Sequence, residues 1–280
     1  MILGYNTNGF TGLDVLQAVE LLHSIGYGGI AITLDQHVLN PFSTDIAEQL
    51  EATANLLKQF AMRCVIETGA RFLVDPQVKH EPTLVTAEQA GPARRVDFLC
   101  RAIDIAAALD ADCVSLWSGT VKDGAGDREA MDRLTTGLIE TLAYAADKNV
   151  FLGFEPEPGM FIDSLARYSD LLAELDAARV ETDLLRLTID VGHLHCQGEL
   201  PIVDKIRQWR DRLVNVHIED MRAGVHEHLM FGEGEIDFPP VIAALREINY
   251  TGPVSVELTR HTHIGPAAAR QAYEFLSPLI

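Results

Sequence analysis

The chain has 280 residues, of which 48 % are hydrophobic and 22 % are charged. These proportions are typical of a globular protein, and the length suits one α/β barrel, which takes about 250 residues. The formal net charge of −19 argues against nucleic acid as a partner. Proteins that bind nucleic acid usually present a basic surface to the phosphates.

The N-terminus and the cysteines indicate the compartment. The first ten residues, MILGYNTNGF, have no basic region followed by an apolar stretch, so we expect no signal peptide. No apolar run reaches about 18 residues, so we expect no membrane span and no membrane partner. None of the four cysteines forms a CxxC pair, which favours free thiols. We therefore expect a cytoplasmic protein.

Short apolar segments alternate with longer amphipathic segments along the whole chain. The short segments lack a strict alternation of polar and apolar residues, as is typical of strands buried on both faces. The predicted strands are residues 1–5, 29–33, 64–67, 113–117, 151–155, 187–190, 214–217 and 254–257.

The amphipathic segments carry apolar residues at helical spacing. Asp163 and Pro239 stand where two of them begin and are typical of helix starts. The predicted helices are residues 12–25, 43–60, 93–109, 128–148, 163–178, 203–212, 239–248 and 265–276.

Eight strand–helix units in succession predict an α/β fold, a single (β/α)₈ TIM barrel that spans residues 1–280 as one domain. A doubly wound open sheet is the alternative. The longest irregular segments are residues 68 to about 91 and 219 to about 238, after the third and seventh strands. Both should lie on the C-terminal face, where barrel active sites are built.

Four consecutive predicted strands end in ionisable residues, namely Glu155, Asp190, His217 and Glu257. Three carboxylates that converge repel one another and raise each other's pKa values, and burying them unpaired is costly. A divalent cation would cancel most of this charge, so the sequence predicts a site for one metal ion. A network of structural ion pairs is the alternative. The oxygen and nitrogen ligands suit Mn²⁺, Mg²⁺, Co²⁺ or Zn²⁺.

These residues also carry a family resemblance. Glu155, the segment 190–193 (Asp-Val-Gly-His), His217, Glu257 and the segment 232–237 (Gly-Glu-Gly-Glu-Ile-Asp) resemble the xylose isomerase-like superfamily of (β/α)₈ barrels. Within it the pattern is most similar to the sugar-phosphate isomerase/epimerase group, which includes ketose 3-epimerases, hydroxypyruvate isomerase and inosose dehydratase. The resemblance covers nearly the whole chain and is specific for the superfamily rather than for one reaction.

The resemblance implies a reaction. In the ketose epimerases the matching four residues bind one divalent metal, which polarises the substrate carbonyl. Glu155 and Glu257 then act as catalytic groups. One removes a proton from the carbon beside the carbonyl, and the other returns a proton on the opposite face. The implied partner is a keto-sugar or related polyol, and the family also suggests a homo-oligomer. A metal-dependent dehydratase of a keto-inositol-like substrate is the alternative, because its reaction also begins with proton removal.

Four further residues are candidates for substrate binding. His193 matches the family histidine that contacts a substrate oxygen. Arg222 resembles the family arginine that binds substrate oxygens, with a spacing that differs by about one residue. Glu157 could hold a substrate hydroxyl, and Trp117 could form a wall of the pocket.

A second metal is suggested by His226 and His228. They stand where endonuclease IV-type members of the superfamily bind an additional metal through an Asp and a His. The nuclease pattern also requires histidines after the third and fourth strands, but these strands end at Glu67 and Trp117. An endonuclease IV-like phosphodiesterase therefore fits the sequence less well than sugar chemistry.

Overall fold

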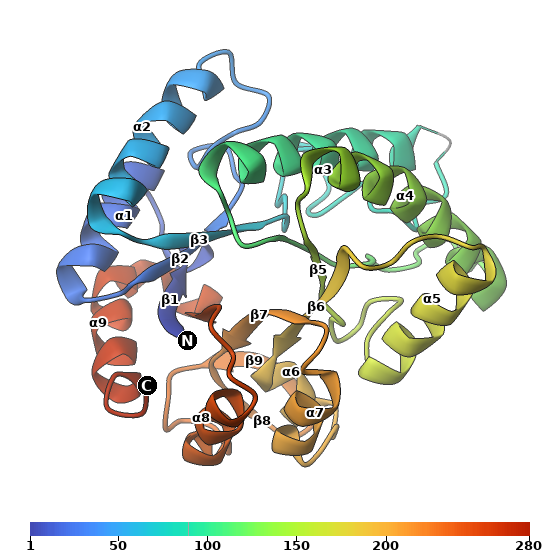
Figure 1. Ribbon diagram of the computed structural model, residues 1–280. Helices are drawn as coiled ribbons and strands as arrows, with labels where there is room; N and C mark the ends of the chain where they lie inside the picture. Colours follow the sequence, from blue (N-terminus) through green and yellow to red (C-terminus); the bar gives the residue numbers. More distant parts are fainter. Residues whose placement is uncertain (89) are drawn as a thin grey trace.

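A computed structural model describes residues 1–88 and 90–280. Eight parallel strands in this part of the chain close into a barrel, with neighbours in the ring order 1, 10, 7, 6, 5, 4, 3, 2 (Figure 1). The predicted (β/α)₈ barrel is thus confirmed, and the open sheet is excluded. The barrel strands are β1 (Ile2–Asn6), β2 (Gly29–Thr33), β3 (Arg63–Glu67), β4 (Val114–Leu116), β5 (Leu152–Phe154), β6 (Leu185–Asp190), β7 (Leu213–Ile218) and β10 (Pro253–Val256).

Helices surround the barrel and cover the outer face of the sheet (Figure 1). Each of the eight predicted helices is present, with ends that differ by a few residues from those expected. The long helices are α1 (Val15–Ile25), α2 (Ile46–Phe60), α3 (Gly91–Leu109), α4 (Asp127–Lys148), α5 (Leu165–Ala177), α7 (Ile202–Trp209), α8 (Phe238–Glu247) and α9 (Gly265–Leu276).

Local capping explains where two helices begin. The Asp14 side chain accepts the Gln17 backbone N–H at 2.9 Å, and the Gln17 side chain accepts the Asp14 N–H at 3.1 Å. This capping box fixes the start of α1 at the next residue. The Ser164 hydroxyl accepts the Arg167 N–H and caps α5. Asp163, the expected start signal, lies one residue before this cap.

The barrel interior becomes polar toward the C-terminal face. Ala31, Val65 and Cys113 are fully buried and form a small apolar cluster inside the barrel. Ser115 and Thr188 are also buried, and their hydroxyl oxygens lie 3.3 Å apart. Buried polar groups need hydrogen-bond partners, so this polar layer is compatible with the polar side chains at the rim of the barrel.

Two elements near the rim differ from the expectation. A short helix, α6 (Val191–Cys196), follows β6 directly, and β8 (Asp220–Arg222) pairs with β9 (Val225–Leu229) in an antiparallel hairpin after β7. The prediction that residues 219 to about 238 are irregular was therefore wrong for the hairpin. The local pattern missed the hairpin because its strands are short and polar.

Asp220 holds the Gly-Glu-Gly-Glu-Ile-Asp segment that follows the hairpin in one conformation. Its carboxylate accepts the backbone N–H groups of Gly232 at 2.8 Å, Gly234 at 2.9 Å and Ile236 at 3.1 Å. A Cβ at residue 234 would clash with the Asp220 carboxylate, so only glycine allows this approach. The motif thus orders the loop beside the site.

Among the residues that the structure describes, no helix is both long and apolar enough to cross a membrane.

Candidate metal centre

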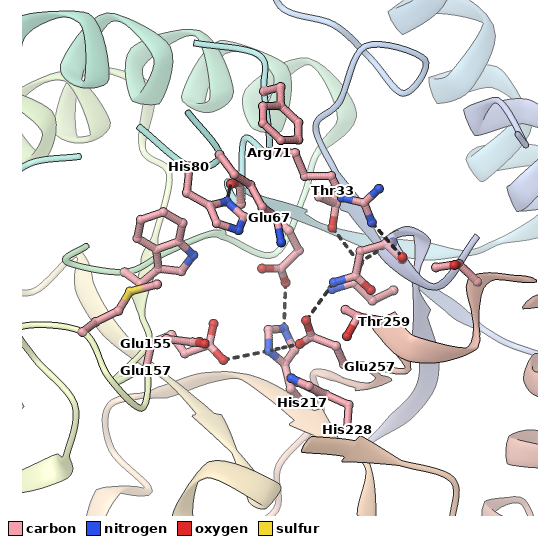
Figure 2. A pocket seen from close by; sticks show the side chains of 18 of the residues that line it. Thr33, Glu67, Arg71, His80, Glu155, Glu157, His217, His228, Glu257 and Thr259 are labelled. Carbon is pink, nitrogen blue, oxygen red and sulfur yellow. Dashed lines mark hydrogen bonds and ion pairs between the residues drawn. The ribbon is translucent and has the colours of Figure 1, made fainter. Parts of the chain in front are cut away.

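The four predicted ligands meet at the C-terminal rim of the barrel. Figure 2 shows three of them, Glu155, His217 and Glu257. Asp190 and His217 stand opposite each other in the pairing of β6 with β7. Glu155 follows the last residue of β5, and Glu257 follows the last residue of β10. One potential ligand atom from each of the four lies within 4.8 Å of the others. The parallel sheet brings them together because its strands all end at the same rim.

The His217 ring is central to this cluster. Its Nδ1 atom lies 3.1 Å from Glu155 Oε1 and 3.1 Å from Glu257 Oε2. Asp190 Oδ1 accepts the backbone N–H of His193 at 2.8 Å, whereas Asp190 Oδ2 is buried without a hydrogen-bond partner in the described chain. A buried, unpartnered carboxylate oxygen at this place fits a ligand for a cation.

Burial perturbs the acids and bases of the cluster. Burial raises the pKa of Glu155 to about 7, although the nearby His217 opposes this. Burial lowers the pKa of His217, but Glu67 and Glu155 outweigh it and raise that pKa well above the usual range. Burial also raises the pKa of Asp190, yet His193 and His228 bring it below the usual range. Glu155 and His217 therefore hold protons more firmly than usual, and a divalent cation would displace them.

These four side chains have the chemistry and the arrangement that a divalent metal ion requires. Three carboxylates and one imidazole converge at short range, and at least one oxygen among them lacks a partner. Oxygen and nitrogen ligands of this kind suit the hard and borderline divalent ions.

A pocket of about 540 Å³ opens over the cluster. Glu67, Glu155 and Glu257 line it with their carboxylates (Figure 2). Trp117 lines it as well, and the loop after β3 contributes Arg71 and Lys79. A pocket of this size, with a few convergent polar groups, suits a small-molecule ligand.

Three of the four predicted substrate contacts lie at this place. Trp117 and Glu157 line the pocket. His193 is buried beside the cluster, with Nδ1 3.6 Å from Glu155 Oε1 and 3.8 Å from Glu157 Oε2. Burial lowers the pKa of His193 to about 3, so its ring is neutral at physiological pH.

The structure does not bring Arg222 to the pocket. Its side chain is exposed on β8, and its Nη2 atom donates to the Glu233 carbonyl oxygen at 2.9 Å. It is absent from the pocket-lining residues of the described chain. The contact with substrate was expected from the number of residues between His217 and Arg222. The β8–β9 hairpin instead places Arg222 away from the pocket.

His226 and His228, from β9, lie beside the first cluster. His193 Nε2 and His226 Nε2 are 3.1 Å apart, and one nitrogen from each of the three histidines lies within 4.8 Å of the others. Burial lowers the pKa of His226. A second group of potential metal ligands therefore adjoins the first.

Several partners of the cluster escaped the sequence prediction. Asn8 Nδ2 donates to Glu257 Oε1 at 2.7 Å, and Glu67 Oε1 lies 2.9 Å from His217 Nε2. Glu219 is fully buried, and neither of its carboxylate oxygens has a hydrogen-bond partner in the described chain. Glu219 also shares a potential metal-ligand group with Asp190 and His228. The only signal for these residues is that each follows or ends a predicted strand.

Comparisons with known proteins agree with this architecture. An uncharacterized protein, MJ1311 of Methanocaldococcus jannaschii, is 30 % identical over 171 residues, which cover 58 % of this chain and only 56 % of that protein. The L-ribulose-5-phosphate 3-epimerase UlaE of Shigella flexneri is 22 % identical over 254 residues, which cover 90 % of this chain and 85 % of UlaE.

Solved structures show the same fold over the full length. The D-allulose 3-epimerase from Methylomonas sp. has a TM-score of 0.77 at 20 % identity and covers 100 % of this chain and 98 % of its own. The IOLI protein, solved with a zinc atom, has a TM-score of 0.76 at 17 % identity, with coverages of 100 % and 98 %. Residues 19–279 match the xylose isomerase-like TIM barrel family, and the chain belongs to that family.

Proposed function

We propose that this protein is a divalent-metal-dependent epimerase or isomerase of a keto-sugar or related polyol. The observation that carries the proposal is the convergence of Glu155 and Glu257 on His217 Nδ1, at 3.1 Å each, beneath a pocket of about 540 Å³. Relatives that act as sugar epimerases support the same class of reaction.

Glu155, Asp190, His217 and Glu257 would hold the metal. When bound, the metal supplies a Lewis acid that polarises a substrate carbonyl. Asp190 and His217 would serve as ligands only. The zinc atom in the related IOLI structure supports a metal in this family.

Proton transfer is the task of the two glutamates. One removes a proton from the carbon beside the carbonyl, and the other returns a proton to the opposite face of that carbon. A carboxylate held within reach of the substrate carbon can serve as the general base or acid of such a step. Asn8 orients Glu257 by donating to its Oε1 atom at 2.7 Å.

The surrounding residues would bind and orient the sugar. Trp117 offers an aromatic face to the apolar side of a sugar ring, and Glu157 and His193 lie where substrate hydroxyls would approach Glu155. The neutral ring of His193 can donate or accept one hydrogen bond from each nitrogen.

Solvent deuterium incorporation tests the reaction. The protein loaded with Mn²⁺ is incubated in D₂O with ketoses, ketose phosphates and inososes, and products are followed by mass spectrometry. We expect one deuterium at a single carbon and an epimer or isomer of unchanged composition. A product lighter by one water would support the alternative dehydratase. An absence of exchange with every member of the three classes would contradict the proposal.

We also propose that His226 and His228, together with His193, bind a second divalent ion. The short Nε2 to Nε2 distance of 3.1 Å between His193 and His226 supports this.

Elemental analysis of the Zn²⁺-loaded protein tests the second site. It should give two ions per chain for the wild-type protein and one for a double variant that carries His226→Ala and His228→Ala. One ion in both proteins would contradict the second site. Two or three ions in the wild-type protein would also reopen the phosphodiesterase alternative, which the deuterium-exchange experiment separates from sugar chemistry.

A further inference from the structure

The two nitrogens of the His217 ring face different carboxylates (Figure 2). Nδ1 lies between Glu155 and Glu257, at 3.1 Å from each. Nε2 lies on the opposite side of the ring, 2.9 Å from Glu67 Oε1. Glu67 belongs to none of the potential metal-ligand groups in the described chain. It therefore faces the ring from the side away from the proposed metal.

Glu67 reaches this position from the far side of the barrel. It ends β3, and His217 lies on β7, 150 positions away in sequence. In the ring order of the sheet, β3 is the fourth strand from β7 in either direction, so the two strands are diametrically opposite. The pair thus spans the interior, where the Glu67 side chain is 9 % exposed and the His217 side chain is 2 % exposed.

Asn215 limits how the proton on His217 can be arranged. Its amide Nδ2 lies 3.2 Å from Glu67 Oε1 and 3.1 Å from His217 Nε2. An amide nitrogen only donates, and a neutral histidine carries its proton on one nitrogen. If Nδ1 carries the proton, Nε2 accepts from Asn215, and Nδ1 has no lone pair for a metal. If Nε2 carries the proton, His217 and Asn215 both donate to Glu67, and the Nδ1 lone pair is free.

We propose that Glu67 is a positioning residue that selects the second of these arrangements. Its carboxylate accepts the Nε2–H of His217 and thereby directs the Nδ1 lone pair toward the place between Glu155 and Glu257. This inference depends on the metal centre of the proposed function but assigns a residue outside the ligand set. Carboxylates that accept the distal N–H of a metal-binding histidine fix the ring and raise its basicity.

Residues that hydrogen-bond to a metal ligand have a known effect on metal affinity. Their loss typically weakens metal binding about 10- to 100-fold, and we expect the same for Glu67. A buried environment strengthens the effect, because hydrogen bonds to ionised groups are stronger where water is excluded.

Metal titration of two Glu67 variants tests the role. Mn²⁺ dissociation constants are measured by competition with a chelator for the wild-type protein, Glu67→Leu and Glu67→Gln. Glu67→Leu removes the acceptor, so Mn²⁺ should bind about 10- to 100-fold more weakly. Glu67→Gln keeps an acceptor oxygen, so its loss should be smaller. Glu81→Gln removes a charge from the loop after β3, outside the pocket, where Glu81 pairs with Lys122. This control should leave the dissociation constant unchanged.

A spectroscopic readout separates positioning from a general structural effect. In ¹⁵N NMR of the Zn²⁺-loaded wild-type protein, His217 should carry its proton on Nε2 and bind zinc through Nδ1. In Glu67→Leu the Nε2 proton should exchange faster with water. Thermal unfolding of each metal-free variant identifies misfolded protein, and the position of the proton on wild-type His217 remains a test if Glu67→Leu does not fold.

Defined outcomes would overturn the inference. Binding of Mn²⁺ by folded Glu67→Leu within twofold of wild type would show that Glu67 does not position the ligand. If only Glu67→Gln folds, the position of the proton on wild-type His217 decides the question. A proton on Nδ1 in the zinc-loaded protein would also exclude the role. Failure of every sugar to exchange deuterium would contradict only the proposed function, whereas a wild-type protein that binds neither ion would remove both.

Discussion

The two halves of the barrel contribute different kinds of residue to one rim. The second half supplies the four predicted metal ligands, from the ends of β5, β6, β7 and β10. The first half supplies side chains that contact those ligands or line the pocket, among them Asn8, Glu67 and Trp117. The difference suggests that one half holds the metal and moves protons, while the other orients the ligands and shapes the pocket. Variants in each half should therefore fail in different ways.

The largest effect should come from a proton-transfer group of the second half. Glu155→Gln should lower the rate of deuterium incorporation by about 10²- to 10⁴-fold, because an amide cannot accept the substrate proton. The rate is measured at saturating Mn²⁺, so that weaker metal binding does not limit it. Glu81→Gln serves as the charge control. A rate within threefold of wild type would remove Glu155 from proton transfer.

Proton competition at the same ligands should make metal binding depend on pH. The pKa values of Glu155, at about 7, and of His217 are both raised, so protons occupy these ligands at low pH and must leave when metal binds. Mn²⁺ affinity should therefore rise with pH and fall as pH drops through 7, by up to about tenfold per unit for each proton displaced. Titrations between pH 6 and pH 8 measure the slope. A flat profile would contradict the assignment of these two ligands.

A variant of the first half should change substrate binding and spare the metal. Trp117→Ala removes an aromatic wall that packs against His80 and Arg95. It should raise the KM about three- to tenfold, as expected for the loss of one aromatic contact. The Mn²⁺ dissociation constant should stay within twofold of wild type. An equal change in metal affinity would show that the halves do not divide their tasks in this way.

The smallest effect should come from Arg222. Its side chain is exposed and donates to the Glu233 carbonyl oxygen. Arg222→Ala should change kcat/KM by less than twofold if the hairpin keeps its position when substrate binds. A loss of tenfold or more would restore the substrate contact that the family resemblance implies, and would require the hairpin to move toward the pocket.

Much of the site could be predicted because parallel strands end at a common rim. An ionisable residue at the end of a buried strand is visible in the sequence, and this placed Glu155, Asp190, His217 and Glu257 together. The pairing of Glu67 with His217 could not be predicted in the same way. It joins residues 150 positions apart across the barrel, and no local pattern encodes such a contact.

The sequence also did not predict the structure of the segment after β7. Its hairpin consists of two short polar strands without apolar alternation, so the sequence predicted an irregular loop. Arg222 therefore lies away from the pocket, whereas His226 and His228 lie next to His193. Glu219 escaped notice because it follows the predicted strand by two residues, and only the folded structure shows that it is fully buried.

A crystal structure of the Mn²⁺-loaded protein, with anomalous scattering data, tests the central claim most directly. We predict a strong anomalous peak at about 2.0–2.3 Å from one atom each of Glu155, Asp190, His217 and Glu257, with His217 ligating through Nδ1. The absence of a peak among these four residues, or a peak held by the three neighbouring histidines alone, would contradict the account.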